Sequence, residues 1–137
     1  MSLIKESKTK GSILVVDDEA SDCELLSYFL QAHGYRVMTA DSGGKAVEII
    51  HKASFNLILL DLVMSPMDGF ETLKVVRKSH SFQELPIIMT TVRDRSADVD
   101  YALELGANDY VTKPILFPLL LSRIQTWIST RPHIFKP

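Results

Sequence analysis

The stretch Asn56-Leu57-Ile58-Leu59-Leu60-Asp61 is a short apolar run that ends in an acid. Three other apolar runs also end in a polar residue: Ile13-Leu14-Val15-Val16 before Asp17-Asp18, Pro86-Ile87-Ile88-Met89-Thr90 before Thr91, and Tyr110-Val111-Thr112 before Lys113-Pro114. Segments with apolar residues at helical spacing separate these runs. Short apolar runs between such segments are typical of parallel strands that are buried on both faces. The sequence therefore predicts an α/β domain with a parallel sheet.

Strand and helix signals alternate along the whole chain. The predicted strands begin near residues 12, 35, 56, 86 and 109, and the predicted helices cover about 20–33, 44–53, 70–79, 96–105 and 118–129. Gly34 and Gly106 follow two of these helices, where a residue without Cβ tolerates the left-handed conformation. We expect a flexible N-terminal lead-in at residues 1–11, one domain at residues 12–130, and a C-terminal tail or the start of a linker at residues 131–137.

Composition excludes several classes of protein. The 137 residues are 46% hydrophobic and 23% charged, which is typical of a globular domain. A formal net charge of -2 argues against direct nucleic-acid binding through general basicity. The single cysteine, Cys23, excludes an internal disulfide framework and fits a cytoplasmic location. No stretch approaches the ~20 apolar residues of a membrane-spanning helix, so we expect no membrane association.

The polar residues after the apolar runs are expected to meet, because ligands of open parallel sheets bind outside the carboxyl ends of the strands. Asp17, Asp18 and Asp61 would repel one another unless a cation lay among them. Carboxylate oxygens with water in the remaining positions suit Mg²⁺. An alternative for Asp18 alone is a helix N-cap, where aspartate is favoured.

A carboxylate beside a metal ion can also attack phosphorus and form an acyl phosphate. We predict that Asp61 is this nucleophile, because it ends the most continuously apolar strand and should lie centrally in the sheet. Lys113 would supply a fixed positive charge, and Thr91 a hydroxyl that donates to a phosphoryl oxygen.

Five segments together resemble the receiver domain of bacterial two-component response regulators. They are Val15-Val16-Asp17-Asp18-Glu19, Asp61-Leu62-Val63-Met64 with Met67-Asp68-Gly69, Pro86-Ile87-Ile88-Met89 into Thr91, Gly106-Ala107-Asn108-Asp109-Tyr110, and Lys113-Pro114. The resemblance covers about residues 11–130. It implies a flavodoxin-like, doubly wound (βα)5 fold, with a five-stranded parallel sheet in order 2-1-3-4-5 and helices on both faces. It also implies phosphotransfer to Asp61 from a sensor histidine kinase or a phosphotransfer protein.

The resemblance assigns further roles by position. Asp18 matches the acid that binds Mg²⁺ directly, and Asp17 its neighbour, which often acts through water. Val63 would offer its backbone carbonyl to the metal. Thr91 and Tyr110 match the switch pair, in which the hydroxyl turns toward the phosphoryl group and the ring turns inward. Lys113 matches the phosphate-pairing lysine, and the proline after it is often cis in this family.

Three departures from the family pattern affect the expected chemistry. Val92 replaces the usual alanine or glycine after the switch threonine, and its branched side chain could narrow access to Asp61. Val63 cannot orient an attacking water, so we predict slow loss of phosphate. Ser65-Pro66 places the proline one residue late, which predicts a differently shaped loop. Arg93 could reach a phosphoryl group, although a surface position is the alternative.

The family transmits its signal through its fourth helix, fifth strand and fifth helix. The predicted last helix is rich in apolar residues, of which Leu119, Leu120, Ile124, Trp127 and Ile128 can serve the core. Tyr101, Leu116, Phe117 and Leu121 are then candidates for an exposed interface with a second copy or an effector domain. A loop or the tail could cover them instead. The chain is either a stand-alone receiver or a piece of a longer regulator or hybrid kinase.

Three rival functions remain. A haloacid-dehalogenase-like hydrolase would need a second acid two residues after the nucleophile, where this chain has Val63. A flavin-binding protein would need a glycine- and hydroxyl-rich loop after the first strand. A degenerate receiver that only binds proteins is kept open by Val92. We therefore expect a phosphoacceptor with no enzymatic turnover of external substrates.

Overall fold

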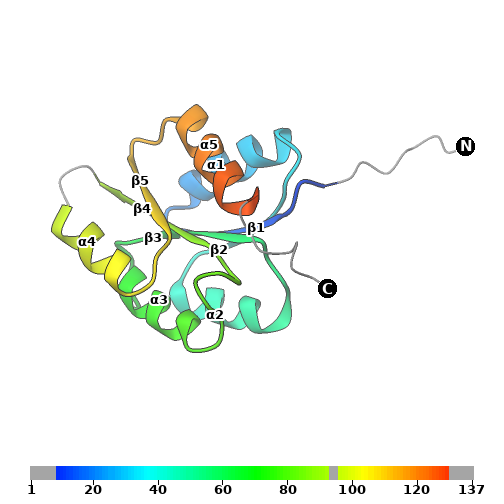
Figure 1. The fold of residues 1–137 in the computed structure, drawn as a ribbon. Coiled ribbons are helices and arrows are strands. Elements are labelled where there is room, and N and C mark those ends of the chain that lie inside the picture. Colours follow the sequence, from blue (N-terminus) through cyan, green and yellow to red (C-terminus); the bar gives the residue numbers. More distant parts are fainter. Residues whose placement is uncertain (1–8, 93–95, 130–137) are drawn as a thin grey trace, which may run out of the picture.

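Five parallel strands form a single sheet between two layers of helices in the computed structural model (Figure 1). The structure describes residues 9–92 and 96–129. The strands are β1 (Ser12–Val16), β2 (Arg36–Ala40), β3 (Leu57–Asp61), β4 (Ile87–Val92) and β5 (Asp109–Lys113). The helices are α1 (Ala20–Ala32), α2 (Gly43–Lys52), α3 (Gly69–Arg77), α4 (Ser96–Glu104) and α5 (Phe117–Ser129). The order β2-β1-β3-β4-β5 confirms the predicted flavodoxin-like (βα)5 fold.

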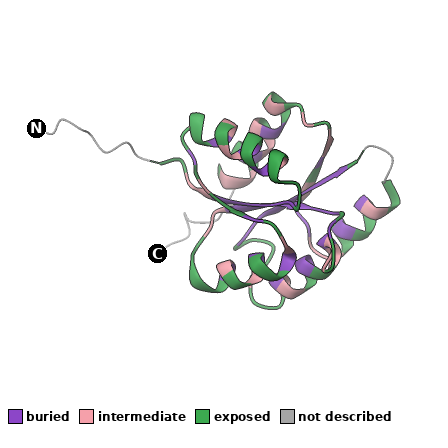
Figure 2. Cartoon of the chain, turned by 180° about the vertical axis from the view of Figure 1, so that it is seen from behind, coloured by how far each residue is buried: buried purple, intermediate pink, exposed green. Residues whose placement is uncertain are grey.

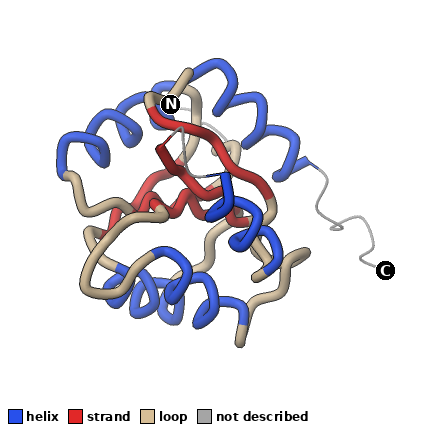
Figure 3. The backbone as a smooth tube through the Cα atoms, turned by 90° about the vertical axis from the view of Figure 1, so that its left-hand side faces the viewer, coloured by secondary structure: helices blue, strands red, loops and turns tan. Residues whose placement is uncertain are grey.

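The sheet separates two hydrophobic cores. Helices α1 and α5 cover one face, and α2, α3 and α4 cover the other (Figure 1). Figure 3 shows the strands between the two layers of helices. Side chains alternate between the two faces along each strand. In β3, Leu57 and Leu59 face α1 and α5, while Ile58 and Leu60 face the other layer. Both faces of the sheet are therefore buried (Figure 2), which explains the continuous apolar runs.

The central strand is β3, as predicted from its composition. All five of its residues are buried, including Asp61 at its carboxyl end. By contrast, β2 lies at the edge of the sheet, and three of its five residues are exposed. The polar end of the most buried strand is thus placed in the middle of one rim of the sheet.

Glycines end two helices as expected. Gly34 after α1 and Gly106 after α4 have φ values of 95° and 112°, in the region that side chains with a Cβ rarely adopt. The Ser65-Pro66 and Lys113-Pro114 peptide bonds are both cis. The second of these agrees with the expectation from the family.

Several predictions concern residues outside the described ranges. Arg93, most of the predicted lead-in at 1–11 and the predicted tail at 131–137 lie there, so the domain boundaries stay predictions. Among the described residues, no helix has the length and hydropathy to cross a membrane. The cytoplasmic location also stays a prediction.

Candidate functional site

Three carboxylates meet at the carboxyl ends of β1 and β3, as the sequence predicted. Oxygen atoms of Asp17, Asp18 and Asp61 all lie within 4.8 Å of one another. Asp17 and Asp61 are almost completely buried, whereas Asp18 is exposed. The N-cap of α1 is Glu19 rather than Asp18, so the alternative explanation of Asp18 as a helix cap is wrong.

Lys113, at the end of β5, lies beside this cluster. Its Nζ is 3.1 Å from Asp17 Oδ2 and 3.4 Å from Asp61 Oδ1. A third carboxylate also contacts it, because Asp22 Oδ2 in the first turn of α1 is 3.5 Å away. Asp22 was not predicted from the sequence. Its only signal was an acid five residues after Asp17, close enough to return to the same rim from the following helix.

The loop after β3 is held against the start of α3. Asp68 and Glu71 form a capping box, in which each side chain accepts from the backbone N–H of the other residue. Gly69 N–H donates to the carbonyl of Leu62 over 2.9 Å. A Cβ at Gly69 would lie 2.5 Å from the carbonyl oxygen of Asp61, so only glycine fits here without a shift of the backbone. The Met67-Asp68-Gly69 motif therefore fixes the backbone that carries Asp61.

Burial and like charge control the electrostatics of Asp61. Desolvation by burial, reinforced by the neighbouring Asp17, raises the pKa of Asp61 to about 6, while Lys113 acts in the opposite direction. Burial also acts to lower the pKa of Lys113, but the carboxylates of Asp61 and Asp17 outweigh it and raise this pKa above its ordinary value. The ammonium therefore stays charged and partly offsets the carboxylate repulsion.

The donor set fits a hard divalent cation. Oxygen atoms of three carboxylates from two adjacent strand ends are close enough to share one ion, and such ligands suit Mg²⁺. The backbone N–H of Val63 approaches Asp61 Oδ1 at 3.4 Å, so the chain turns back over the cluster immediately after β3. This turn keeps the Val63 backbone near the carboxylates, and the role of its carbonyl as a metal ligand stays a prediction.

Thr91 has an unusual environment at the end of β4. Its hydroxyl oxygen is buried and has no hydrogen-bond partner within the described ranges. Buried hydroxyls are normally paired, and an exception calls for an explanation. Thr91 lies one position beyond Thr90, the register partner of Asp61. An acceptor arriving at this rim would satisfy the hydroxyl.

Tyr110 lies on the same face of the sheet as Thr91. It pairs with Met89 in register, and Met89 and Thr91 point to the same face because they are two residues apart. The Tyr110 side chain is partly exposed at the edge of the sheet. The structure thus brings the two predicted switch residues onto neighbouring strands of one face.

The comparisons with known proteins agree with this geometry. A sequence model of the response regulator receiver domain matches residues 13–125. The chain belongs to this family. Chemotaxis protein CheY4 of Vibrio cholerae is 34% identical, with a TM-score of 0.79 over 84% of this chain and 96% of that one. A two-component response regulator from Clostridium difficile is 25% identical, with a TM-score of 0.82 over 90% and 98% of the two chains.

A longer relative contains the same fold. NtrX from Brucella abortus is 27% identical and has a TM-score of 0.83 over 89% of this chain, but the match covers only 28% of NtrX. Receiver domains therefore occur both as nearly whole chains, as in CheY4, and as parts of larger proteins.

The predicted interface of this receiver domain is corrected in part. Leu116 is 67% exposed and Tyr101 is exposed, as expected. Phe117 and Leu121 were also expected on the surface, but both pack against the core between α1, α5 and the sheet. The Phe117 ring lies 4.6 Å from that of Phe29, centroid to centroid.

The helical phase of α5 explains this error. The helix begins at Phe117. The residues that pack inward recur every three or four positions and form one face of the helix: Phe117, Leu120, Leu121, Ile124, Trp127 and Ile128. Leu119 was assigned to the core but lies off this stripe and is exposed. Leu116 and Leu119 are thus the large apolar residues exposed at the start of α5.

The two valines that depart from the family pattern lie close to the site. Val63 and Val92 are each about half exposed at the ends of neighbouring strands. Val92 is the register partner of Lys113. The expectation that Val92 narrows access to Asp61 stays a prediction.

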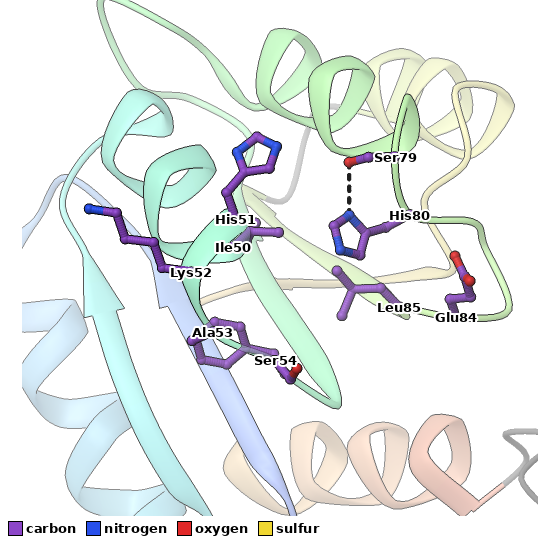
Figure 4. Close-up of a pocket in the computed structure, with 10 residues that line it drawn as sticks. Ile50, His51, Lys52, Ala53, Ser54, Ser79, His80, Glu84 and Leu85 are labelled. Atoms are coloured by element: carbon purple, nitrogen blue, oxygen red, sulfur yellow. Dashed lines mark hydrogen bonds between the residues drawn. The ribbon is translucent and has the colours of Figure 1, made fainter.

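Two pockets differ in their relation to the site. A pocket of about 220 Å³ adjoins it, with Asp17, Asp22 and Lys113 at one side and an apolar wall made of Leu25, Leu26, Pro114, Ile115 and Phe117. A larger pocket of about 610 Å³ lies between the end of α2 and the loop after α3 (Figure 4). His51, His80 and Glu84 line it, but none of the acids or the lysine of the rim does.

A half-buried arginine stabilises the end of the sheet opposite the carboxylates. Arg77 donates to the carbonyl of Gly106 over 2.9 Å and to Asn108 Oδ1 over 2.8 Å. Asn108 in turn accepts from the backbone N–H of Ile87. Burial lowers the pKa of Arg77 to about 10. This network joins α3 to the starts of β4 and β5, and it was not predicted from the sequence.

Proposed function

We propose that Asp61 is the phosphoacceptor of this receiver domain. The observation that carries the proposal is the surroundings of this carboxylate. It is 5% exposed, lies 3.4 Å from a lysine ammonium, and shares a 4.8 Å cluster with two further carboxylates. A nucleophile at the centre of a charged rim, beside a fixed cation, suits attack on a phosphoryl group.

The proposed reaction transfers a phosphoryl group from a phosphohistidine. An Asp61 carboxylate oxygen forms a bond to phosphorus, and the bond from phosphorus to the donor imidazole nitrogen breaks. The imidazole leaves with the electron pair and takes up a proton, and Asp61 becomes an acyl phosphate. Mg²⁺ held by Asp17, Asp18 and Asp61, with the Val63 carbonyl, would neutralise charge on the phosphoryl oxygens. Lys113 pairs with one of those oxygens.

The unpaired Thr91 hydroxyl supports a conformational response. In our proposal it donates a hydrogen bond to the new phosphoryl group, and the movement frees space on the face that it shares with Tyr110. The Tyr110 ring then turns from its exposed position into that space. The domain acts as a switch that holds a phosphoryl group, without turnover of external substrates.

The surroundings of the rim support a protein as the phosphodonor. The apolar pocket between α1 and the start of α5 adjoins both Lys113 and Asp17, and exposed Leu116 lies next to its wall. An apolar surface beside the reacting carboxylate is suited to docking of a partner. The donor in this proposal is a sensor histidine kinase or a phosphotransfer protein.

Output is proposed through α4, β5 and α5. Tyr101, Tyr110 and Leu119 on these elements are exposed. They could contact a second copy of the chain or an effector domain. Sedimentation with and without beryllofluoride, a phosphoryl mimic, tests the dimer: a monomer under both conditions would exclude it.

A phosphorylation assay tests the central proposal. The protein is incubated with Mg²⁺ and acetyl phosphate, and its intact mass is measured. We expect the parent chain to gain one phosphoryl group and Asp61→Asn to gain none. Asp100→Asn is a matched control, because Asp100 is exposed on α4 and lies outside the carboxylate cluster. No gain by the parent chain would favour the degenerate receiver that only binds proteins.

A further inference from the structure

Lys113 is shared among three carboxylates before any phosphoryl group is present. An ammonium has three N–H donors, and its nitrogen lies 3.1 Å from Asp17, 3.4 Å from Asp61 and 3.5 Å from Asp22. The contact to Asp17 is a hydrogen bond, and those to Asp61 and Asp22 are ion pairs. A phosphoryl oxygen that approaches Lys113 therefore competes with three carboxylates for one ammonium.

Asp22 is the neighbour most easily released. Its distance to Nζ is the longest of the three, and its side chain is 43% exposed, whereas those of Asp17 and Asp61 are 2% and 7% exposed. Water can solvate the Asp22 carboxylate after release, but it cannot easily reach the other two. Asp22 also comes from α1 rather than from a strand end, so its movement leaves the sheet undisturbed.

We infer that Asp22 is a positioning residue that holds Lys113 in its resting place and opposes phosphoryl transfer from free anionic donors. It competes with the phosphoryl oxygens for the ammonium and adds a like charge at the opening of the site. This inference rests on the proposed function, and it explains why an acid lines the pocket beside the reacting carboxylate. A donor that brings its own positive charge near Asp22 would overcome the opposition.

A purely local explanation of Asp22 makes a different prediction. An acid in the first turn of a helix interacts favourably with the helix dipole. If this were its whole contribution, neutralising Asp22 would lower the melting temperature slightly and would leave phosphoryl transfer unchanged. Glu24 provides the matched control, because it lies on the same helix and lines a different pocket with no contact to Lys113.

The experiment compares Asp22→Asn, Asp22→Glu and Glu24→Gln with the parent chain. It measures the affinity for beryllofluoride with Mg²⁺ and the initial rate of phosphorylation by acetyl phosphate. We expect Asp22→Asn to increase both by about two- to five-fold, the range of a partly exposed ion pair. The increase should shrink at about 1 M salt, where the screening length is ~3 Å. Asp22→Glu and Glu24→Gln should stay close to the parent chain.

The outcomes separate this inference from the proposed function. If the parent chain takes up no phosphoryl group and no beryllofluoride, both proposals fail. If the parent chain is phosphorylated but Asp22→Asn is unchanged or slower, only the inference about Asp22 is overturned. An equal increase in Glu24→Gln would also overturn it, because general charge on α1 would then explain the effect.

Discussion

Lys113 Nζ lies 3.1 Å from Asp17 Oδ2, although 96 residues separate the two in sequence. The sheet makes this contact possible, because β1 and β5 are both parallel to β3 and end at the same rim. Asp17 is almost completely buried, and Lys113 is mostly so. The ion pair is thus part of the fold as well as part of the site.

Removal of this ammonium should destabilise the protein. Lys113→Met keeps most of the length of the side chain but leaves Asp17 and Asp61 buried without their cation. We expect the free energy of unfolding at pH 7, with a chelator present, to fall by roughly 1 to 3 kcal/mol. Urea denaturation measures this. Lys45→Met, on the exposed side of α2, is the control and should change stability little. Equal stability of the two variants would contradict the expectation.

The pKa of Asp61 predicts a pH-dependent gain in stability for Asp61→Asn. Because the folded-state pKa is raised from 3.8 to about 6, folding favours the protonated acid. Stability from this group is full below pH 4 and is lost as the pH rises through about 6. Without divalent cations, Asp61→Asn should therefore be more stable than the parent chain by about 2 to 3 kcal/mol at pH 7. Thermal denaturation between pH 4 and pH 7 tests this. A difference that does not grow with pH would refute it.

The unpaired hydroxyl of Thr91 predicts opposite effects on stability and on binding. Thr91→Val has the same shape without the buried polar group, so the free protein should become more stable by about 1 kcal/mol. Its affinity for beryllofluoride should fall by about ten-fold or more, because a hydrogen bond to a charged acceptor is lost. Calorimetric titration and thermal denaturation measure the two effects. Thr91→Ser retains the hydroxyl and should bind like the parent chain. A Thr91→Val variant that binds beryllofluoride as tightly as the parent chain would contradict the proposed role of Thr91 in the switch.

Val63 predicts a long-lived acyl phosphate. Its half-exposed apolar side chain cannot orient a water molecule for attack on the phosphoryl group. Val63→Asn adds a polar group at this position and should shorten the lifetime several-fold. Loss of phosphate is followed by intact mass after the donor has been removed. A variant that loses phosphate no faster than the parent chain would count against the prediction.

The close backbone contact at Gly69 leaves no room for a Cβ, so we expect even alanine to disturb the site. Gly69→Ala would press a Cβ against the backbone of Asp61 and Leu62. We expect a loss of roughly 1 to 3 kcal/mol in stability, together with slower phosphorylation. Gly44→Ala in α2 is the matched control, because its Cβ would meet nothing within 4 Å. That variant should be slightly stabilised by the better helix propensity of alanine. A stable and fully reactive Gly69→Ala would be inconsistent with the close approach.

The sequence predicted the strands and the rim because these features depend on short local patterns. An apolar run such as Leu57–Leu60 is typical of a parallel strand that is buried on both faces. The acid that follows the run then lies at the carboxyl end of that strand. Asp17, Asp18, Asp61 and Lys113 were placed together on this ground. The strand order came from the family resemblance, since periodicity alone does not determine which strands are neighbours.

Other features depended on helix phase or on contacts between distant segments. Phe117 and Leu121 were misplaced because the apolar residues of α5 surround more than one face, and the sequence alone does not determine which face packs against the sheet. Asp22 and the Arg77 network escaped prediction for a related reason. Their partners come from other elements, and an acid or arginine on a helix is usually a surface residue.

The unsatisfied hydroxyl at position 91 has a consequence for engineering. A library of this domain screened only for heat resistance would enrich variants that lose this hydroxyl and the carboxylate at position 61, since each is expected to weaken the resting fold. Such a screen would select against signalling without ever measuring it. Stabilising substitutions are better sought on the exposed surfaces of the last turns of α2 and α3, away from Thr91 and Asp61.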